Sequence, residues 1–580
     1  MAPIKDNSPD HKFIYWIALV GLFLFTMTSG IIGYHGYLII HGEEHNFLRT
    51  LYRTLQLFNF EGGDLAKPLP WELNLARFTG PITTIMALLA ALLELFKEQW
   101  QRLRISWMKN HVVIIGFGKK GKSIMEESIQ NKERVLIIEL DPLNPNLASI
   151  RLPRCRLILG DATNISIIRK SRITKAKSVF LLMGDDTRQI NACLIIYQLI
   201  KQCSRNDSNA LNCIMHLQKQ DFLNTMRSHN LTQDTKDGLT VNIFNVYENS
   251  ARELFEKNPP DRLGISEHSE KYVQIIIFGF GQAGEALALQ TALNGHYLNG
   301  KKPHVLVVDR MAAQKIPDFL RRYPTYIDYC DLLYLDLEAD SPQLIHHLSN
   351  HLGDPNALTT MVICFDNSTH NMLLGSQLEN IIKTKPDDPP WLFVRINDDE
   401  SYHTFTGNIN PYGLPSAACS QEVICTGKLD KLSMAFHENY LIERAQKRKK
   451  DPNLPKKEAE KVWNNLSQEY KDSNRKAADH MGVKLRGIKC EIVDINNTKA
   501  EALFDPDELE KLAMLEHERW SAERSLAGWT YAKKDDPSTR KNENLVDWDI
   551  LSNDTKDYDR TSVGSIPQIL KLIDMKMVRR

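Results

Sequence analysis

The chain has 580 residues, of which 72 are basic and 72 acidic, so its formal net charge is zero. This length is enough for roughly three or four ordinary domains, and the balanced charge argues against a protein that binds the nucleic-acid backbone. The nine cysteines are scattered without a CxxC pair, which argues against a disulfide framework and against a zinc or other metal site.

An apolar stretch near the N-terminus is the first feature along the chain. Residues 13–40 contain no Asp, Glu, Lys or Arg over 28 positions, enough to cross a bilayer with tilt. A signal peptide would have a shorter apolar region and a small-residue cleavage site, whereas this stretch ends at HGEEH. We therefore expect a membrane span.

A second uncharged run, residues 78–93, is 16 residues long. It fits either a buried helix of a soluble domain or a second span, and we expect the span because a first one precedes it. The following KEQWQRLRISWMKNH is rich in Lys, Arg and Trp, as is typical of a cytoplasmic membrane border. Residues 1–105 are thus predicted to be a multi-pass domain in the inner (cell) membrane, with the lipid bilayer as a partner and both termini cytoplasmic.

A short amphipathic helix is predicted between the two spans. Leu48, Leu51, Leu55 and Phe58 recur at helical spacing, and the helix should end near Asn59. EGGD and KPLP then supply turn residues. The segment fits either an external loop with a surface helix or a re-entrant pore helix with a mouth loop, which needs surrounding protein or water at membrane depth.

Two stretches, residues 110–250 and 272–430, each alternate buried strands with helices. The first contains HVVIIGFG, ERVLIIELD, CRLILGDAT and KSVFLLMGDD; the second contains VQIIIFGFG, HVLVVDR, DLLYLDLEAD, TMVICFDNS and WLFVRIND. Strands that are apolar on both faces are typical of parallel sheets covered by helices. We predict two α/β doubly wound, Rossmann-like domains.

The remaining chain changes character. Residues 431–465 are basic and interrupted by proline, which indicates a linker or a solvated helix end. Residues 466–580 are predicted to form a small, mainly α domain. One of its helices is well marked: Asp505 can cap it, Pro506 fits its first turn, Glu508 completes a capping box, and Gly528 is placed to end it.

Each α/β domain begins with a glycine turn between a strand and a helix. In such turns one glycine permits the tight bend, one lets the backbone approach a pyrophosphate, and one lets the helix pack closely; an acid at the end of the next strand can bind ribose hydroxyls. The candidate residues in the first domain are Gly116, Gly118, Gly121, Glu139 and Asp161. Those in the second are Gly279, Gly281, Gly284 and Asp309.

The second turn differs from the first. The second domain has no GDAT after its third strand, so its glycines fit either ligand binding or packing alone. No catalytic base is recognisable beside a nicotinamide site in either domain. We therefore expect NAD(H) or another adenine nucleotide to be a regulatory ligand, and we expect the protein not to be an enzyme.

The first α/β domain resembles the RCK (TrkA-N) domain of potassium channels and transporters. The resemblance rests on HVVIIGFGKKGKSI, LIIELD, LILGDAT and VFLLMGDD, and it extends more loosely to the second domain. A two-span potassium channel has the same layout: an apolar span, a short helix, a glycine-containing loop, a second span and then tandem RCK domains. The resemblance implies a homotetramer around one pore, in which the duplicated domains form a cytoplasmic gating ring.

The expected selectivity filter departs from the family pattern. Backbone carbonyls of a TVGYGD-like run replace the hydration shell of potassium in that family. Here the equivalent positions, predicted to line the pore, are Asn59, Phe60, Glu61, Gly62, Gly63 and Asp64, of which only the final GD matches. A ring of Glu61 carboxylates would suit a pore that conducts cations with little preference for potassium.

The C-terminal region resembles the RyR domain, the repeat named after ryanodine receptors. The matching stretches are SNRKAADH, LAMLEHERWSAERSLAGWTY and KDYDRTSV. The resemblance implies recognition of a nucleotide-like ligand, in a bacterial protein of nucleotide signalling or phage defence. The candidate ligand residues are Arg519, Trp520, Glu523, Arg524, Trp529, Asp559 and Arg560, although tryptophans in a core and structural Glu–Arg pairs would give the same pattern.

Three functions are compatible with these sequence features. We expect a cation channel gated by a nucleotide. The alternatives are a membrane-anchored NAD-dependent enzyme and a nucleotide receptor whose membrane segment does not conduct.

Overall fold

The computed structural model describes the chain except for residues 1–10, 44–45, 62–64, 151–153, 204, 206–208, 220–221, 224–225, 227–237, 383–388, 398–409, 425–427 and 452–453. The described chain divides into two compact units. The first contains residues 1–109 and two short later segments, 147–156 and 170–172; the second contains the rest. Each unit is described by itself.

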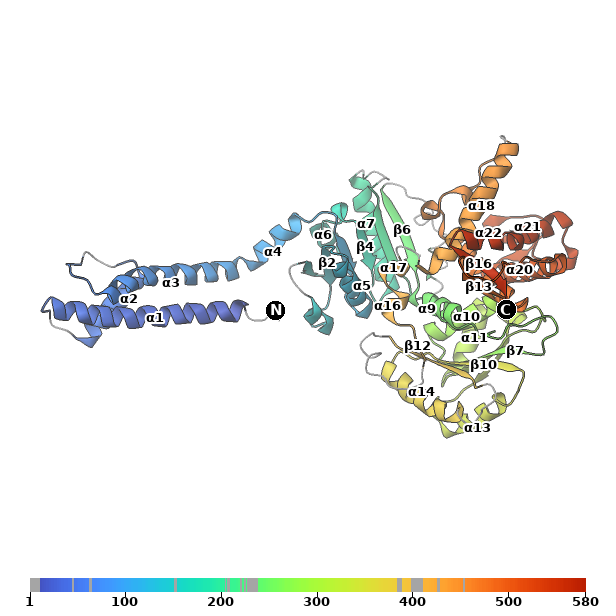
Figure 1. Cartoon of the computed structure of the whole chain (residues 1–580), viewed down its shortest axis with the longest axis horizontal. Helices are drawn as coiled ribbons and strands as arrows, with labels where there is room; N and C mark the ends of the chain where they lie inside the picture. Colours follow the sequence, from blue (N-terminus) through green and yellow to red (C-terminus); the bar gives the residue numbers. More distant parts are fainter. Residues whose placement is uncertain are drawn as a thin grey trace. The chain divides into compact units, whose positions relative to one another are not determined.

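The first unit consists of α1 (His11–Ile40), α2 (Phe47–Phe58), α3 (Trp71–Leu95) and α4 (Lys97–Ser106). α1 and α3 run antiparallel side by side, since the Tyr15 hydroxyl donates to the Met86 carbonyl at 2.9 Å and Gly33 lies against Leu73 (Figure 1). By length and composition, Tyr15–Ile40 and Trp71–Leu95 could each cross a membrane. The second predicted span is therefore a longer helix than its 16-residue uncharged run indicated.

The short helix α2 packs between small residues of the two long helices. Its buried face is Thr50, Thr54 and Leu57. A Cβ on Gly30 would lie 2.5 Å from the Thr54 side chain, and one on Gly80 would lie 2.9 Å from the Leu57 carbonyl oxygen. Small residues allow this close approach of helices. The predicted helix ending at Asn59 is confirmed, with Asn59 as its C-cap.

The second unit begins with a six-stranded sheet whose strand order is β3-β2-β1-β4-β5-β6. The strands are β1 (Val112–Ile115), β2 (Val135–Glu139), β3 (Cys155–Leu159), β4 (Ser178–Leu181), β5 (Leu211–His216) and β6 (Leu239–Phe244). The helices between and after them are α5 (Lys119–Gln130), α6 (Ile165–Lys170), α7 (Asp186–Gln202) and α9 (Val246–Lys257). β1 pairs in parallel with both β2 and β4, as predicted.

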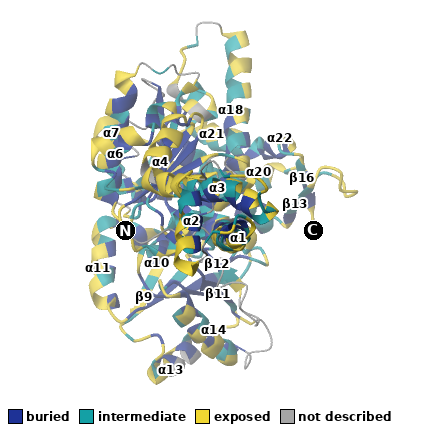
Figure 2. Ribbon diagram, turned by 90° about the vertical axis from the view of Figure 1, so that its left-hand side faces the viewer, coloured by how far each residue is buried: buried dark blue, intermediate teal, exposed yellow. Residues whose placement is uncertain are grey.

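The second sheet has the same topology, in the order β9-β8-β7-β10-β11-β12 when read from its third strand. Its strands are β7 (Tyr272–Phe278), β8 (His304–Val308), β9 (Asp331–Leu335), β10 (Ala357–Ile363), β11 (Trp391–Arg395) and β12 (Asn410–Tyr412). Its main helices are α10 (Gln282–Asn294), α11 (Ala312–Arg322), α13 (Pro342–His351) and α14 (Ser368–Ile382). Buried residues concentrate in strands β7, β8, β10 and β11, whose apolar runs lie between helices (Figure 2). The prediction of a buried strand was wrong for β9, which lies at the edge of the sheet and is mostly exposed.

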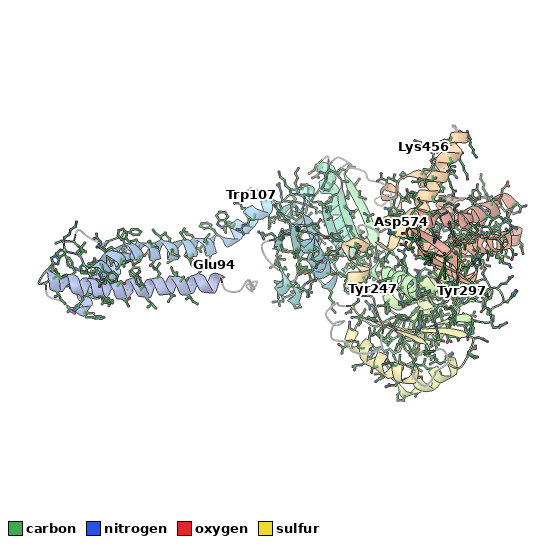
Figure 3. The ribbon with its side chains drawn as sticks, viewed as in Figure 1. Glu94, Trp107, Tyr247, Tyr297, Lys456 and Asp574 are labelled. Atoms are coloured by element: carbon green, nitrogen blue, oxygen red, sulfur yellow. The ribbon has the colours of Figure 1, made fainter. Side chains whose placement is uncertain are left out.

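The two α/β domains touch through side chains at their strand ends. The Arg395 guanidinium lies 5.1 Å from the ring centre of Tyr247, which is labelled in Figure 3 near the start of α9. Short helices α16 (Pro415–Ala418) and α17 (Gln421–Ile424) follow the second sheet, and the backbone N–H of Gln421 donates to Glu127 of α5 at 2.6 Å. The duplicated domains therefore form one packed pair.

The C-terminal region contains α18 (Lys431–Lys450), α19 (Gln468–Gly487), α20 (Pro506–Leu526), α21 (Asn553–Gly564) and α22 (Ile566–Lys571). β13 (Cys490–Asp494) and β16 (Met575–Arg579) form an antiparallel pair beside them. The capping box of Asp505 and Glu508 is present, and Gly528 follows the α20 C-cap with φ +81°. Much of the segment predicted as a linker or solvated helix end is helix α18, whose first half is buried at Ser433, Ala435 and His437.

Candidate functional site

The first glycine turn lies between β1 and α5 and has an open centre. Gly116 has φ +89°, a conformation that favours glycine. A Cβ on Gly121 would lie 2.6 Å from the Gly116 carbonyl oxygen, whereas one on Gly118 would meet no atom within 4 Å. The outer glycines are thus required by the fold, and the middle one leaves the N-terminus of α5 accessible to a phosphate.

The second turn repeats this geometry. Gly279 has φ +90°, and a Cβ on Gly284 would lie 2.4 Å from the Gly279 carbonyl oxygen. Gly281 has no atom within 4 Å of its would-be Cβ. The space that a phosphate needs is therefore kept in both domains.

The two acids after the second strands hold their own glycine turns. Glu139 accepts the backbone N–H of Phe117 at 2.7 Å, and Asp309 accepts that of Phe280 at 2.7 Å. Asp309 also pairs with Lys315 Nζ at 2.7 Å, whereas Glu139 makes no ion pair with any residue that the structure describes. Both Glu139 oxygens instead accept hydrogen bonds from backbone N–H groups and from Asn144, and ribose binding by either acid stays a prediction.

The contacts of Asp309 and Asp161 set the pKa of each carboxyl group. Burial raises the pKa of Asp309, but the Lys315 ammonium and two backbone N–H groups outweigh burial and lower the pKa below its ordinary value. Asp161, at the end of β3, lies farther out. It accepts from Thr163 and from Arg188 at 2.9 Å, and its pKa is lowered chiefly by the Thr163 N–H.

Two lysines in the first turn of α5 were not among the predicted site residues. Lys119 Nζ donates to the Asn397 side chain of the second domain at 2.9 Å. Lys120 Nζ lies 3.4 Å from His216 Nδ1 at the end of β5, and burial lowers the pKa of both groups. The doubled lysine in GFGKKG was the available signal, because it brings cations to the helix end where a phosphate would bind.

The seven candidates in the C-terminal domain separate into three groups. Arg519 is 2% exposed and pairs with Glu516 at 2.9 Å and with Glu523 at 2.6 Å, while Lys484 pairs with Glu516 at 2.5 Å. Burial raises the pKa of Glu516, but Arg519 and Lys484 outweigh burial and lower it to about 2. Arg519 therefore lies in a buried ion-pair network, as expected if the Glu–Arg pairs of this domain are structural.

Trp520, Arg524 and Trp529 lie together nearer the surface. The Arg524 guanidinium is 4.9 Å from the Trp529 ring centre and 5.9 Å from that of Trp520. Its Nη1 pairs with Glu469 at 3.2 Å, while its buried Nε has no hydrogen-bond partner among the described residues. This group is an aromatic surface with a guanidinium donor, the combination that was predicted to hold a nucleotide.

Asp559 and Arg560 belong to α21. Asp559 lies 3.5 Å from His517 Nδ1, and Arg560 pairs with Glu510 at 2.7 Å. Sequence reasoning missed His517, whose ring lies 5.7 Å from that of Trp520 and so connects α21 to the aromatic surface. Burial lowers the pKa of His517, but Asp559 and the Val546 carbonyl outweigh burial and raise it above its ordinary value.

Family models match two parts of the chain. The TrkA-N domain model matches residues 112–228, and the RyR domain model matches residues 497–579. Residues 112–228 thus resemble a TrkA-N domain, and residues 497–579 resemble a RyR domain. Both resemblances predicted from the sequence are confirmed.

Relatives with known sequences match over short stretches. An uncharacterized protein of Methanothermus fervidus is 35% identical over 86 residues, 14% of this chain and 13% of that protein. Potassium channel protein 1 of Methanocaldococcus jannaschii is 33% identical over 87 residues, 15% of this chain and 26% of that protein. The match thus spans about a quarter or less of either relative.

Among solved structures, GsuK bound to ADP aligns with a TM-score of 0.37 and 14% identity, over 69% of this chain and 94% of that chain.

Proposed function

We propose that the chain is a subunit of a cation channel that opens or closes when its TrkA-N domain binds an adenine nucleotide. The observation that carries the proposal is the α1–α2–α3 arrangement, with α2 packed between two apolar helices, ahead of a TrkA-N domain with an open glycine turn. The name of the Methanocaldococcus relative supports a potassium-channel type of protein. The ligand is NAD(H) or another adenine nucleotide, and its role is regulatory.

The proposed channel is an assembly of several subunits in the membrane. The subunits form a homotetramer in the inner membrane, with both termini and the second unit in the cytoplasm. The exposed apolar side chains along α1 and α3, among them Ile17, Phe23, Leu88 and Leu92, supply surface for lipid and for neighbouring subunits. The RyR domain links the channel to nucleotide signalling, with phage defence as one setting for it.

Glu61 is proposed to line the pore. It follows α2 directly, where its backbone N–H donates to the Gln56 carbonyl at 3.2 Å, and its side chain is exposed. Of the other predicted pore residues, Asn59 is the C-cap of α2 and Phe60 is exposed with φ +66°, while Gly62, Gly63 and Asp64 lie outside the described residues.

Replacing Glu61 by Gln should lower the permeability of cations relative to chloride severalfold, because it removes one carboxylate per subunit from the mouth. Reversal potentials of the purified protein in planar bilayers measure this ratio, and Glu126→Gln on the exposed face of α5 is the matched control. Unchanged cation preference in Glu61→Gln would exclude Glu61 from the pore. A protein that passes no ions in any state would favour the non-conducting receptor.

The Trp520–Arg524–Trp529 group is proposed to be part of a ligand sensor in the RyR domain. Arg524→Ala should leave the melting temperature within about 2 °C of wild type, because its ion pair is with the exposed Glu469 at 3.2 Å and such a pair contributes little, and it should abolish the channel's response to its signalling nucleotide. Flux measured against a panel of nucleotides tests the response, with exposed Lys499→Ala as the control in the same domain. A normal response in folded Arg524→Ala would remove this surface as the sensor.

A further inference from the structure

The guanidinium group of Arg524 lies beside two tryptophan rings near the end of α20. Its central carbon is 4.9 Å from the Trp529 ring centre and 5.9 Å from that of Trp520. A guanidinium that rests on aromatic faces keeps its N–H groups for hydrogen bonds in its own plane. These groups are not fully used, because the buried Nε of Arg524 has no hydrogen-bond partner among the residues that the structure describes.

Glu469, in the first turn of α19, pairs with this guanidinium group. Its carboxylate lies 3.2 Å from Arg524 Nη1, and the Glu469 side chain is 60% exposed whereas that of Arg524 is 21% exposed. The carboxylate therefore reaches the guanidinium from the solvent side, from which a ligand would also arrive. Carboxylate and phosphate oxygens accept the same N–H donors of a guanidinium, so the Glu469 carboxylate occupies the position that suits the anionic group of a ligand.

The neighbouring acid, Glu523, is committed to the interior of the domain. It accepts a hydrogen bond from Arg519 at 2.6 Å and lies 3.8 Å from Lys476 Nζ, and its side chain is buried. In the part of the chain that the structure describes, the ion pair of Arg524 is with Glu469. Removal of this one carboxylate should therefore change the affinity of Arg524 for an anion.

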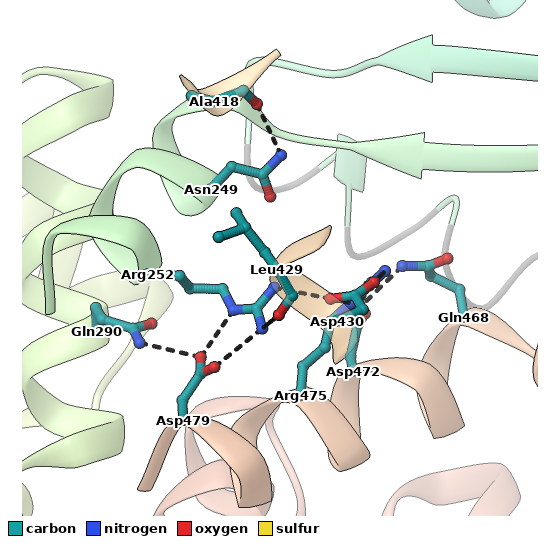
Figure 4. A network of polar contacts seen from close by, with 10 residues as sticks. All are labelled: Asn249, Arg252, Gln290, Ala418, Leu429, Asp430, Gln468, Asp472, Arg475 and Asp479. Atoms are coloured by element: carbon teal, nitrogen blue, oxygen red, sulfur yellow. Dashed lines mark hydrogen bonds and ion pairs between the residues drawn. The ribbon is translucent and has the colours of Figure 1, made fainter. Parts of the chain in front are cut away.

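Mostly buried ion pairs hold helix α19, which carries Glu469 (Figure 4). Asp479 accepts from Arg252 of α9 at 2.8 and 2.9 Å, and Arg475 Nε donates to Asp430, the N-cap residue of α18, at 2.9 Å. A buried ion pair is much harder to break than an exposed one. An arriving anion should therefore displace the side chain of Glu469 and not the helix.

We infer that Glu469 is an internal competitor, whose carboxylate holds the place of the ligand's anionic group on Arg524 and weakens binding until the ligand displaces it. This inference rests on the proposed sensor role of the Trp520–Arg524–Trp529 group. It assigns two chemical features to the ligand: a planar ring that stacks on a tryptophan, and a phosphate that pairs with the guanidinium. Competition by Glu469 raises the ligand concentration at which the sensor is half occupied.

The test is calorimetric titration of the full-length protein in detergent with AMP, GMP, CMP and UMP, and with the four nucleosides that lack the phosphate. Every sample carries Gly118→Val and Gly281→Val, so that neither glycine turn contributes to the binding. Glu469→Gln should bind at least one monophosphate about threefold more tightly or better, as expected when one exposed competing charge is removed. Nucleoside affinity should not change, since a nucleoside has no anionic group to compete with Glu469.

Two further variants serve as controls. Glu491→Gln removes the same charge from another exposed ion pair of the domain, with Lys499 at 2.9 Å, and should leave every affinity unchanged. Arg524→Ala, combined with Glu469→Gln, should abolish the gain. Thermal unfolding of Glu469→Gln should match that of the parent protein, because the ion pair that it loses is exposed on the Glu469 side.

The inference is overturned if Glu469→Gln binds no monophosphate more tightly than the parent protein does, if nucleosides gain as much as monophosphates, or if the gain persists without Arg524. Monophosphate binding that depends on Arg524 but not on Glu469 would leave the proposed sensor in place and remove the competitor. Since both glycine turns are blocked in every sample, a failure here is distinct from a failure of the channel gated through the TrkA-N turn.

Discussion

Gly118→Val is expected to abolish adenine-nucleotide binding by the TrkA-N glycine turn while leaving the fold intact. No atom lies within 4 Å of a Cβ built on Gly118, and its backbone is extended with φ −78°, so the protein can accept the side chain. The added isopropyl group would occupy the space in which a pyrophosphate approaches the N-terminus of α5. The affinity for NAD⁺ or ADP should therefore fall at least about a hundredfold, a loss of roughly 2.7 kcal/mol or more.

Gly121→Val is the matched control for this prediction. Its Cβ would lie 2.6 Å from the Gly116 carbonyl oxygen, so helix α5 must move away from the turn. This change should lower the free energy of unfolding by about 1–3 kcal/mol, as overpacking does. Titration and thermal unfolding together distinguish the two variants, and nucleotide affinity unaffected by Gly118→Val would refute binding at this turn.

The corresponding pair of substitutions in the second domain tests whether its glycine turn binds a nucleotide. Gly281→Val and Gly284→Val have the same geometry as Gly118→Val and Gly121→Val. If Gly281→Val removes a second molecule of bound nucleotide, the second turn is a site. If stoichiometry stays the same, its glycines serve packing.

Arg519→Ala is expected to destabilise the C-terminal domain by about 3–5 kcal/mol, because it leaves Glu516 and Glu523 buried without their guanidinium. Both carboxylates are about 5% exposed, so water cannot replace the lost donor. Urea unfolding of the full-length protein, followed by a probe in the C-terminal domain, measures the change. A loss below about 1 kcal/mol would show that the network is not a structural element.

The pH dependence of this network follows from Glu516. Its pKa is lowered in the folded state from 4.5 to about 2, so its contribution to stability is fully present above pH 4.5. That contribution is lost as the pH falls from 4.5 towards 2. Arg519→Ala should therefore weaken the acid dependence of unfolding in this window.

The parts of the fold that could be predicted are those set by local pattern. Apolar runs followed by glycine turns identified both doubly wound domains, and Asp505, Glu508 and Gly528 marked the bounds of α20. Helix α18 was harder to predict because its last turn is entirely basic, although its first half is buried against the C-terminal domain.

The sites were harder to predict than the fold, because they depend on contacts between segments that are far apart in the sequence. The spacing of Glu516, Arg519 and Glu523 placed them near one another on a helix, but only the packing of α19 brings Lys484 to them and closes the network. A cavity of about 380 Å³ in the second unit is lined by residues as far apart as Asn212 and Lys476, each unremarkable in its own segment. Neither periodicity nor a motif within one segment predicts that residues of three domains lie together.

The most direct test of the proposed channel is ion flux into liposomes that contain the purified full-length protein, started by adenine nucleotides added to the side that carries the cytoplasmic unit. Rubidium and sodium uptake should begin or stop on addition of NAD⁺, NADH or ADP, chloride uptake should not follow, and Gly118→Val should show no response. Cation uptake that is absent with every nucleotide, or that responds equally in wild type and Gly118→Val, would contradict a channel gated through the TrkA-N turn.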